Sequence, residues 1–154
     1  MDVGGGKGLL SYLLSKSGWK ATVVDPVEDV WLKKYKDIET KKQIKLAEGE
    51  IEDVSRIKAI FSENMVKDFD LIIGLHAHGS NMQIINACAK YGKDFLLLHC
   101  CVIDEPIVKM PGIDWMESLV EYAESKGFKV KTDTLFFKGQ NILIYTDKTL
   151  KKIG

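Results

Sequence analysis

An acid and three alternating glycines open the chain in the pattern Asp2-x-Gly4-x-Gly6-x-Gly8, with a further glycine at Gly5. Apolar residues at helical spacing follow directly. Glycine is needed where a backbone turns sharply from a strand into a helix and lies against a ligand, because a Cβ would collide. The N–H groups of the helix's first turn then favour a negatively charged or carboxylate-bearing group. The segment is therefore predicted to bind such a ligand; the alternative is a glycine-rich turn that binds nothing.

The spacing of these glycines differs from that of two common phosphate-binding loops. The dinucleotide fingerprint G-x-G-x-x-G, counted from Gly4, would need a glycine at Leu9. A P-loop would need Ser or Thr after Lys7, where Gly8 stands.

A second acid, Asp25, ends a short β-branched segment (20–25) that Pro26 stops. It lies roughly 20 residues beyond the glycines, where an acid at a strand's carboxyl end can accept hydrogen bonds from both hydroxyls of a ribose. We therefore predict a nucleoside contact at Asp25. The alternative is that Asp25 caps a helix beginning near Val27.

All three histidines and two of the three cysteines lie in two short stretches, His76-Ala77-His78 and His99-Cys100-Cys101. Each stretch follows a predicted buried strand, and open α/β sheets bind ligands outside the carboxyl ends of their strands. An imidazole titrates near neutral pH, so His76 and His78 are candidate general bases for a hydroxyl substrate. The alternative for each is a hydrogen bond to strand-end backbone.

Imidazole and thiolate also suit zinc, but the chain has no C-x-x-C or other standard ligand spacing, so no metal site is predicted.

These residues need elements to position them, and the hydrophobic pattern predicts strands alternating with helices. The last two strands are joined by so short a turn (138–140) that they must be antiparallel, whereas a dinucleotide-binding domain would usually end on a parallel strand. The predicted strands are 1–3, 20–25, 44–47, 69–75, 94–98, 129–137 and 141–147, and the predicted helices are 9–16, 27–35, 54–61, 80–91 and 115–126.

The glycine pattern resembles the first motif of class I S-adenosylmethionine-dependent methyltransferases. The segment 74–79 is similar to the Gly-Leu-His-x-Cys-Gly-Asp motif of one subgroup, and 99–102 to its Pro-Cys-Cys-Tyr motif. That subgroup includes tRNA acceptor-stem 2′-O-methyltransferases and glutathione-S-transferase-C-terminal-domain-containing proteins. The resemblance spans residues 1 to 102. It departs from the subgroup where His78 replaces cysteine, Ser80 an acid, His99 proline and Val102 tyrosine.

The resemblance implies a Rossmann-like α/β fold with sheet order 3-2-1-4-5-7-6, the last strand antiparallel and helices on both faces. It implies one domain over residues 1–154 with S-adenosylmethionine as cofactor. Glu50 and Ile51, after the predicted third strand, would meet the adenine; the alternative is an acidic turn that caps the helix 54–61. The implied cofactor-binding residues are Asp2, Gly4, Gly5, Gly6, Gly8, Asp25, Pro26, Glu50, Ile51, Leu75 and His76.

The implied activity is methyl transfer to an unidentified acceptor: a hydroxyl, for which an RNA ribose is one candidate, or a small molecule. Exocyclic base amines are disfavoured because no Asn-Pro-Pro-Tyr type of sequence follows the fourth strand. The alternatives are a non-catalytic module that binds S-adenosylmethionine, and a zinc-binding domain that uses the His/Cys cluster.

Composition limits the partners and the compartment. Basic and acidic residues number 22 each, so no overall field attracts nucleic acid. The lysine-rich stretch 33–45 is interpreted as a solvated face and loop; the alternative is a local nucleic-acid patch. No apolar run approaches the roughly 20 residues of a membrane span. Three cysteines do not make a disulfide framework, and a reducing cytoplasm is expected.

The first strand is expected to be clipped. Only three residues precede Gly4, whereas strands usually have about five. N-terminal residues are therefore expected to be missing from the domain. The sequence makes no prediction of oligomeric state.

Overall fold

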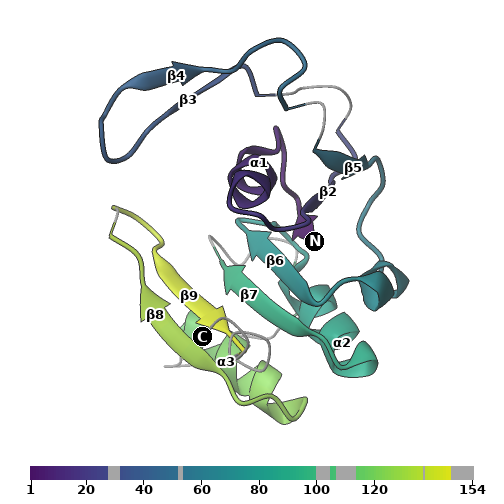
Figure 1. Ribbon diagram of the computed structural model, residues 1–154. Helices are drawn as coiled ribbons and strands as arrows, with labels where there is room; N and C mark the ends of the chain where they lie inside the picture. Colours follow the sequence, from purple (N-terminus) through teal and green to yellow (C-terminus); the bar gives the residue numbers. More distant parts are fainter. Residues whose placement is uncertain (28–31, 52–53, 100–104, 107–113, 137, 147–154) are drawn as a thin grey trace.

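The computed structural model describes residues 1–27, 32–51, 54–99, 105–106, 114–136 and 138–146. A seven-stranded sheet runs through it in the order β5-β2-β1-β6-β7-β9-β8 (Figure 1). The strands of this sheet are β1 (Asp2–Val3), β2 (Thr22–Val24), β5 (Ser55–Ile57), β6 (Leu71–Leu75), β7 (Asp94–Leu98), β8 (Lys131–Thr134) and β9 (Ile142–Tyr145).

The strand directions match those predicted. The five strands from β5 to β7 are mutually parallel, and β9 runs antiparallel to both β7 and β8. Counted along the chain, the seven strands have the order 3-2-1-4-5-7-6, so the predicted α/β topology and its antiparallel last strand are confirmed.

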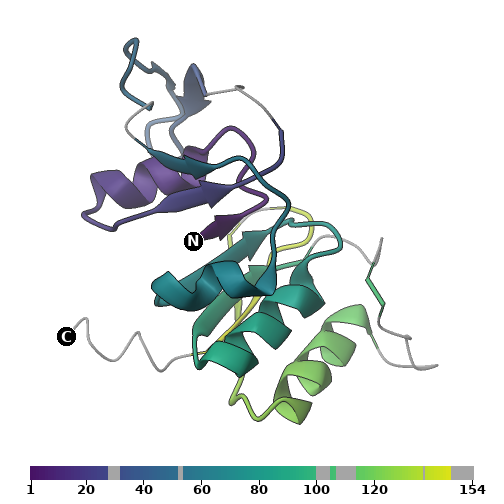
Figure 2. The same ribbon diagram turned by 90° about the vertical axis from the view of Figure 1, so that its right-hand side faces the viewer.

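Helices cover both faces of the sheet, as predicted. Helix α1 (Leu9–Lys16) lies on one side, and α2 (Asn81–Tyr91) and α3 (Trp115–Ser125) lie on the other (Figures 1 and 2). A 3-10 turn, η1 (Glu63–Asp68), precedes β6 and packs against α2. The main core lies on the α2 face and includes Ile72, Ile84, Phe95 and Leu119, all fully buried.

The first strand is short, as expected. β1 has two residues, while β6 beside it has five. Met1 extends the pairing by one step, since its carbonyl accepts a hydrogen bond from Ile73 N and its amine donates to the Leu71 carbonyl, both at 2.8 Å. Strand β6 is thereby hydrogen-bonded to Met1 in addition to the two residues of β1.

The sequence prediction is wrong in part between residues 32 and 61: a strand overlaps the predicted 44–47, but it is not a strand of the main sheet. β3 (Lys34–Lys36) occupies the end of the predicted helix 27–35, and it pairs with β4 (Gln43–Lys45) in a separate two-stranded hairpin. The third strand of the main sheet is β5, where the helix 54–61 was expected. A three-residue strand is too short to show a hydrophobic period, and its parallel pairing with β2 decides its conformation.

Within the described part of the chain, no helix combines the length and the apolar character that a membrane crossing requires.

Candidate functional site

The glycine loop between β1 and α1 is held against the end of β2. Gly4 N donates to the Val24 carbonyl at 2.8 Å, and Gly8 adopts a left-handed φ of 81° where α1 begins. A Cβ on Gly5 would lie 2.6 Å from Asp2 Oδ2, closer than real Cβ contacts allow. The loop therefore lies directly over the Asp2 carboxylate, and glycine at position 5 is what permits this approach.

Asp2 is 2% exposed, and its Oδ2 accepts a hydrogen bond from Ser11 Oγ at 3.0 Å. Burial raises the pKa of this carboxyl to about 6, against the lowering effects of Ser11 and the nearby Met1 amine. Asp2 thus lies beneath the loop and ties it to α1 through Ser11.

Asp25 joins the glycine loop to the end of β2. One carboxylate oxygen accepts a hydrogen bond from Gly6 N at 2.9 Å, and the other accepts one from Val27 N at 2.8 Å. The second bond is an Asx turn, in which the side chain bonds the backbone two residues on. Residues 28–31 lie outside the described part of the chain, so the alternative that Asp25 caps a helix is untested.

A cavity of about 310 Å³ opens at the carboxyl ends of β1, β2 and β6. It brings together four residues that the sequence analysis singled out, Gly4, Pro26, His76 and His78. This is the edge of the sheet at which open α/β folds bind ligands.

Eight of the predicted site residues lie outside the lining of this cavity: Asp2, Gly5, Gly6, Gly8, Asp25, Glu50, Ile51 and Leu75. Asp2 and Leu75 line a larger groove of about 880 Å³ on the α1 face of the sheet. Glu50 and Ile51 line neither the cavity nor the groove.

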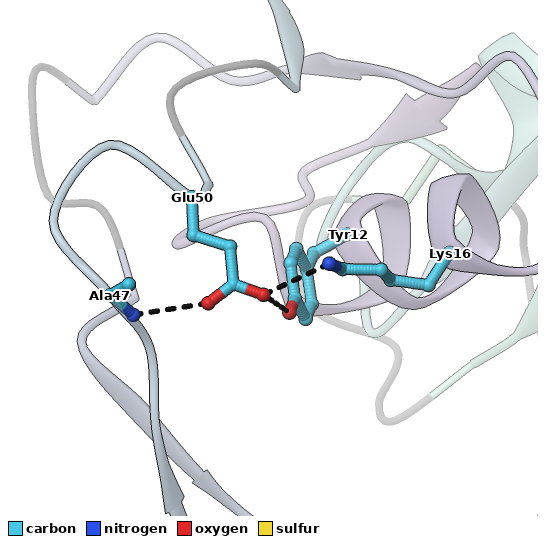
Figure 3. A network of polar contacts seen from close by, with 4 residues as sticks. All are labelled: Tyr12, Lys16, Ala47 and Glu50. Carbon is cyan, nitrogen blue, oxygen red and sulfur yellow. Dashed lines mark hydrogen bonds and ion pairs between the residues drawn. The ribbon is translucent and has the colours of Figure 1, made fainter.

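Glu50 belongs to a different network, shown in Figure 3. Its Oε1 accepts a hydrogen bond from Tyr12 Oη at 2.5 Å and pairs with Lys16 Nζ at 2.9 Å, while Oε2 accepts from Ala47 N at 3.0 Å. These contacts lower the pKa of Glu50 to about 2, and the hydrogen bond from Tyr12 has the largest effect. The carboxylate therefore fastens the segment after β4 to the outer face of α1.

The reason for assigning the adenine to Glu50 and Ile51 is therefore wrong, because neither residue follows the third strand of the sheet. Ile51 is buried in a small core beside Tyr12 and Val23. Among the residues that follow the true third strand, Ile60 and Phe61 line the cavity. The sequence analysis missed them because it took 54–61 for a helix; an apolar pair three and four residues after the strand would have been the signal.

The histidines lie at the ends of two paired strands. Leu75 of β6 is in register with Leu98 of β7, so His76 and His99 follow at neighbouring positions. His76 N donates to the Leu98 carbonyl at 2.8 Å, and His76 has a φ of 57°, which is rare for a residue other than glycine. The predicted proximity of the two stretches is confirmed for His76 and His99; Cys100 and Cys101 lie outside the described residues.

The two imidazoles have different environments. His76 is exposed at the cavity, whereas His99 is 5% exposed and its Nδ1 has no hydrogen-bond partner among the described residues. Burial lowers the pKa of His99, the neighbouring His76 lowers it further, and Asp114 opposes the shift.

Glu105 is a site-edge residue that the sequence analysis missed. Its carboxylate accepts hydrogen bonds from Asn81 N (2.7 Å), Asn81 Nδ2 (2.8 Å) and Met82 N (3.2 Å), at the start of α2. It therefore joins the segment after β7 to the helix that follows His78. No local sequence pattern signals this contact, which spans more than 20 residues.

The metal hypothesis is not tested. Cys100 and Cys101 lie outside the described residues, and within those residues no three His, Cys, Asp or Glu side chains gather as metal ligands would. The third cysteine, Cys88, is buried in the main core, and burial raises the pKa of its thiol to about 12.

The chain resembles known proteins in its three-dimensional structure. No family model and no curated protein sequence matches the chain. A precorrin-6y C5,15-methyltransferase from Geobacter metallireducens GS-15 superposes with a TM-score of 0.56 at 16% identity, covering 94% of this chain and 75% of its own. The antibiotic-resistance methyltransferase Kmr superposes with a TM-score of 0.54 at 13% identity, covering 94% of this chain and 84% of its own. The chain therefore has the Rossmann-like fold of class I methyltransferases.

Proposed function

We propose that this chain binds S-adenosylmethionine at the carboxyl ends of β1 and β2 and transfers its methyl group to an acceptor hydroxyl beside His76. The observation that carries the proposal is the cavity of about 310 Å³, because the glycine loop, the end of β2 and His76 all meet there. The fold of two solved methyltransferases supports it.

Residues close in the chain to those that line the cavity, although they do not line it themselves, suit the chemical groups of this cofactor. No side chain caps α1 at Gly8, so N–H groups of its first turn can receive the carboxylate of the methionine end. The Asp25 carboxylate at the end of β2 can accept hydrogen bonds from ribose hydroxyls, in addition to those it accepts from the backbone. Asp2, which lies beneath the loop, would hold the loop in shape.

The adenine would lie on Ile60. This side chain is 78% exposed and lines the cavity together with Phe61 and Pro26. An exposed isoleucine gains about 1.5–3 kcal/mol when it is fully buried. Covering Ile60 with an aromatic ring would therefore favour binding.

His76 would act as the general base. S-adenosylmethionine supplies an electrophilic methyl group when bound, and methyl transfer depends mainly on holding the acceptor in line with it. The His76 imidazole is exposed at the cavity, so it can accept the proton that an acceptor hydroxyl loses. His78, also exposed there, is the second candidate.

Isothermal calorimetry tests the cofactor. S-adenosylmethionine, or the demethylated product, is expected to bind more tightly than NAD. Asp25→Asn is expected to weaken binding by about 1–3 kcal/mol, because the ribose loses a charged acceptor. Asp133→Asn is the matched control, since that exposed carboxylate also accepts a backbone N–H but lies on β8. Tighter binding of NAD, or equal effects of the two variants, would contradict the proposal.

A non-catalytic binding module is the second candidate function, and transfer of a radiolabelled methyl group by the wild type separates an enzyme from it. If the chain is an enzyme, this transfer to hydroxylated acceptors should be measurable in the wild type and about 10²–10⁴-fold slower in His76→Gln at saturating cofactor.

A further inference from the structure

The β3–β4 hairpin extends away from the main sheet, beyond α1 (Figure 1). Its antiparallel register pairs Lys34 with Lys45, Tyr35 with Ile44 and Lys36 with Gln43. Side chains alternate between the two faces of a strand, and directly paired residues share a face. The register therefore separates the hairpin into two faces of different chemistry.

The inner face is apolar and packs on the body of the protein. Tyr35 and Ile44 are half-buried, and the Tyr35 ring meets the Tyr12 ring of α1 edge to face, with centroids 6.2 Å apart. Leu32 and Leu46, at the base of the hairpin, pack against the same small core. This packing fixes which face points outward.

The outer face is basic. Lys34, Lys36 and Lys45 share it with Gln43, and all four are exposed. No described residue forms an ion pair with any of the three lysines. Lys34 and Lys45 stand directly opposite each other, and like charges in such a pair destabilise a hairpin. We name Lys34, Lys36 and Lys45 the basic face.

The acidic residues of the hairpin do not offset this charge. The stretch 33–45 contains six lysines and two acidic residues. One of these, Asp37, lies past the end of β3 and accepts hydrogen bonds from Thr40 N (2.6 Å) and Thr40 Oγ1 (2.7 Å). A chain of zero net charge therefore carries a local positive field on this hairpin.

The base of the hairpin adjoins the glycine loop. Leu32 N donates to the Lys7 carbonyl at 3.2 Å, and Lys7, on that loop, is itself exposed. A second contact, from Arg56 Nη2 of β5 to the Gly6 carbonyl, fixes the loop from the neighbouring strand. The hairpin thus begins beside the loop that forms one wall of the proposed cofactor site.

We propose that the basic face binds the phosphodiester backbone of a single-stranded nucleic acid. The inference rests on the proposed function, because the hairpin begins beside the glycine loop of the proposed cofactor site. Lysines two positions apart on a strand are separated by about 6.6 Å, so the face offers a row of point charges to a chain with one charge per nucleotide. It has no aromatic side chain for stacking and no arginine fork, so it would contact phosphates and not base edges.

Fluorescence anisotropy with a labelled single-stranded RNA, and with DNA of the same sequence, tests the proposal. The test variant is Lys34→Gln/Lys36→Gln/Lys45→Gln. Three other exposed lysines, changed in Lys67→Gln/Lys126→Gln/Lys129→Gln, give a control with the same loss of charge. Circular dichroism checks that both variants fold, as expected for exposed positions.

The wild type is expected to bind both strands, and the test variant about tenfold or more weakly at low salt. The slope of log K against log salt should decrease in magnitude by about 2, because each phosphate contact on a single strand contributes about 0.7. The control variant should keep the wild-type slope within about 0.7. A preference for RNA would assign a role to the 2′-hydroxyl, and equal binding would assign the contact to phosphate alone; both support the proposal.

Three results would overturn it: no binding of either strand, an equal loss in both variants, or tighter binding to polyglutamate or to phosphatidylserine vesicles. Calorimetry with S-adenosylmethionine on the same samples separates the two proposals. If the cofactor binds and the strands do not, only the docking surface fails. If the cofactor does not bind, the proposed function fails first.

Discussion

The two halves of the sheet edge that carries the cavity are built differently. On the β1–β2 side, the carboxylates of Asp2 and Asp25 already accept hydrogen bonds from Ser11, Gly6 and Val27. On the β6–β7 side, His76 is exposed with a φ of 57°, and His99 has an Nδ1 with no partner among the described residues. The first half is preorganised by the protein itself, while the second has polar groups that a ligand can complete.

The same difference appears in the response of the two halves to pH. Burial raises the pKa of Asp2 and lowers the pKa of His99, because in each case it disfavours the charged form. On these shifts, acidification stabilises the β1–β2 side through Asp2 and destabilises the β6–β7 side through His99. Three variants test this comparison, in order of expected effect.

Gly5→Ala should have the largest effect. The new Cβ would lie 2.6 Å from Asp2 Oδ2 and 3.0 Å from Val23 Cγ1, and overpacking of this kind costs about 1–3 kcal/mol or more. We expect a loss of about 3 kcal/mol in the free energy of unfolding, measured in urea, together with loss of cofactor binding. In an Asp2→Ala background the cost should be smaller, since the two closest clashing atoms, both of the Asp2 carboxylate, are gone and only the Val23 contact remains. An equal cost in both backgrounds would show that the loop does not depend on this contact.

Asp2→Asn should change how stability depends on pH. The folded-state pKa is raised from 3.8 to about 6, so the contribution of Asp2 to stability is fully present below 3.8 and is lost as the pH rises through about 6. Two pKa units correspond to up to about 3 kcal/mol. Urea unfolding between about pH 4 and about pH 7 should show this loss in the wild type and not in the variant. If the free energy of unfolding depends on pH in the same way in both proteins, the inference that burial raises the pKa of Asp2 is contradicted.

His99→Gln should have a smaller effect of opposite sign, because Asp114 offsets part of the shift. The lowered folded-state pKa means that His99 contributes stability above its ordinary pKa of 6.5, and that this stability is lost as the pH falls through the folded value. Over the same pH range, the wild type should lose this stability as the pH falls, and the variant should not. If the His99 C2 proton, followed by NMR, titrates at or above 6.5, the comparison of the two halves fails.

The sequence by itself determined the elements whose signals are local. The glycines fix a turn at which Gly8 has positive φ, so α1 was predicted with its observed bounds, Leu9–Lys16. Continuous apolar runs placed β6 within the predicted 69–75 and β7 at its observed bounds, and the predicted helix 115–126 begins where α3 begins, after an Asp114 that forms a capping box with Glu117. The short final turn was enough to establish the antiparallel pair.

Only the tertiary structure decided what depends on distant partners. β5 is a strand because β2 pairs with it, and that pairing moved the adenine candidates from Glu50 to Ile60. Three of the six lysines of 33–45 form the basic face only because the register pairs Lys34 with Lys45. The partners of Glu105 lie 23 and 24 residues away. Local sequence restricts the backbone through sterics and capping. The conformation of short strands and the partners of polar side chains depend instead on residues that come close only when the chain folds.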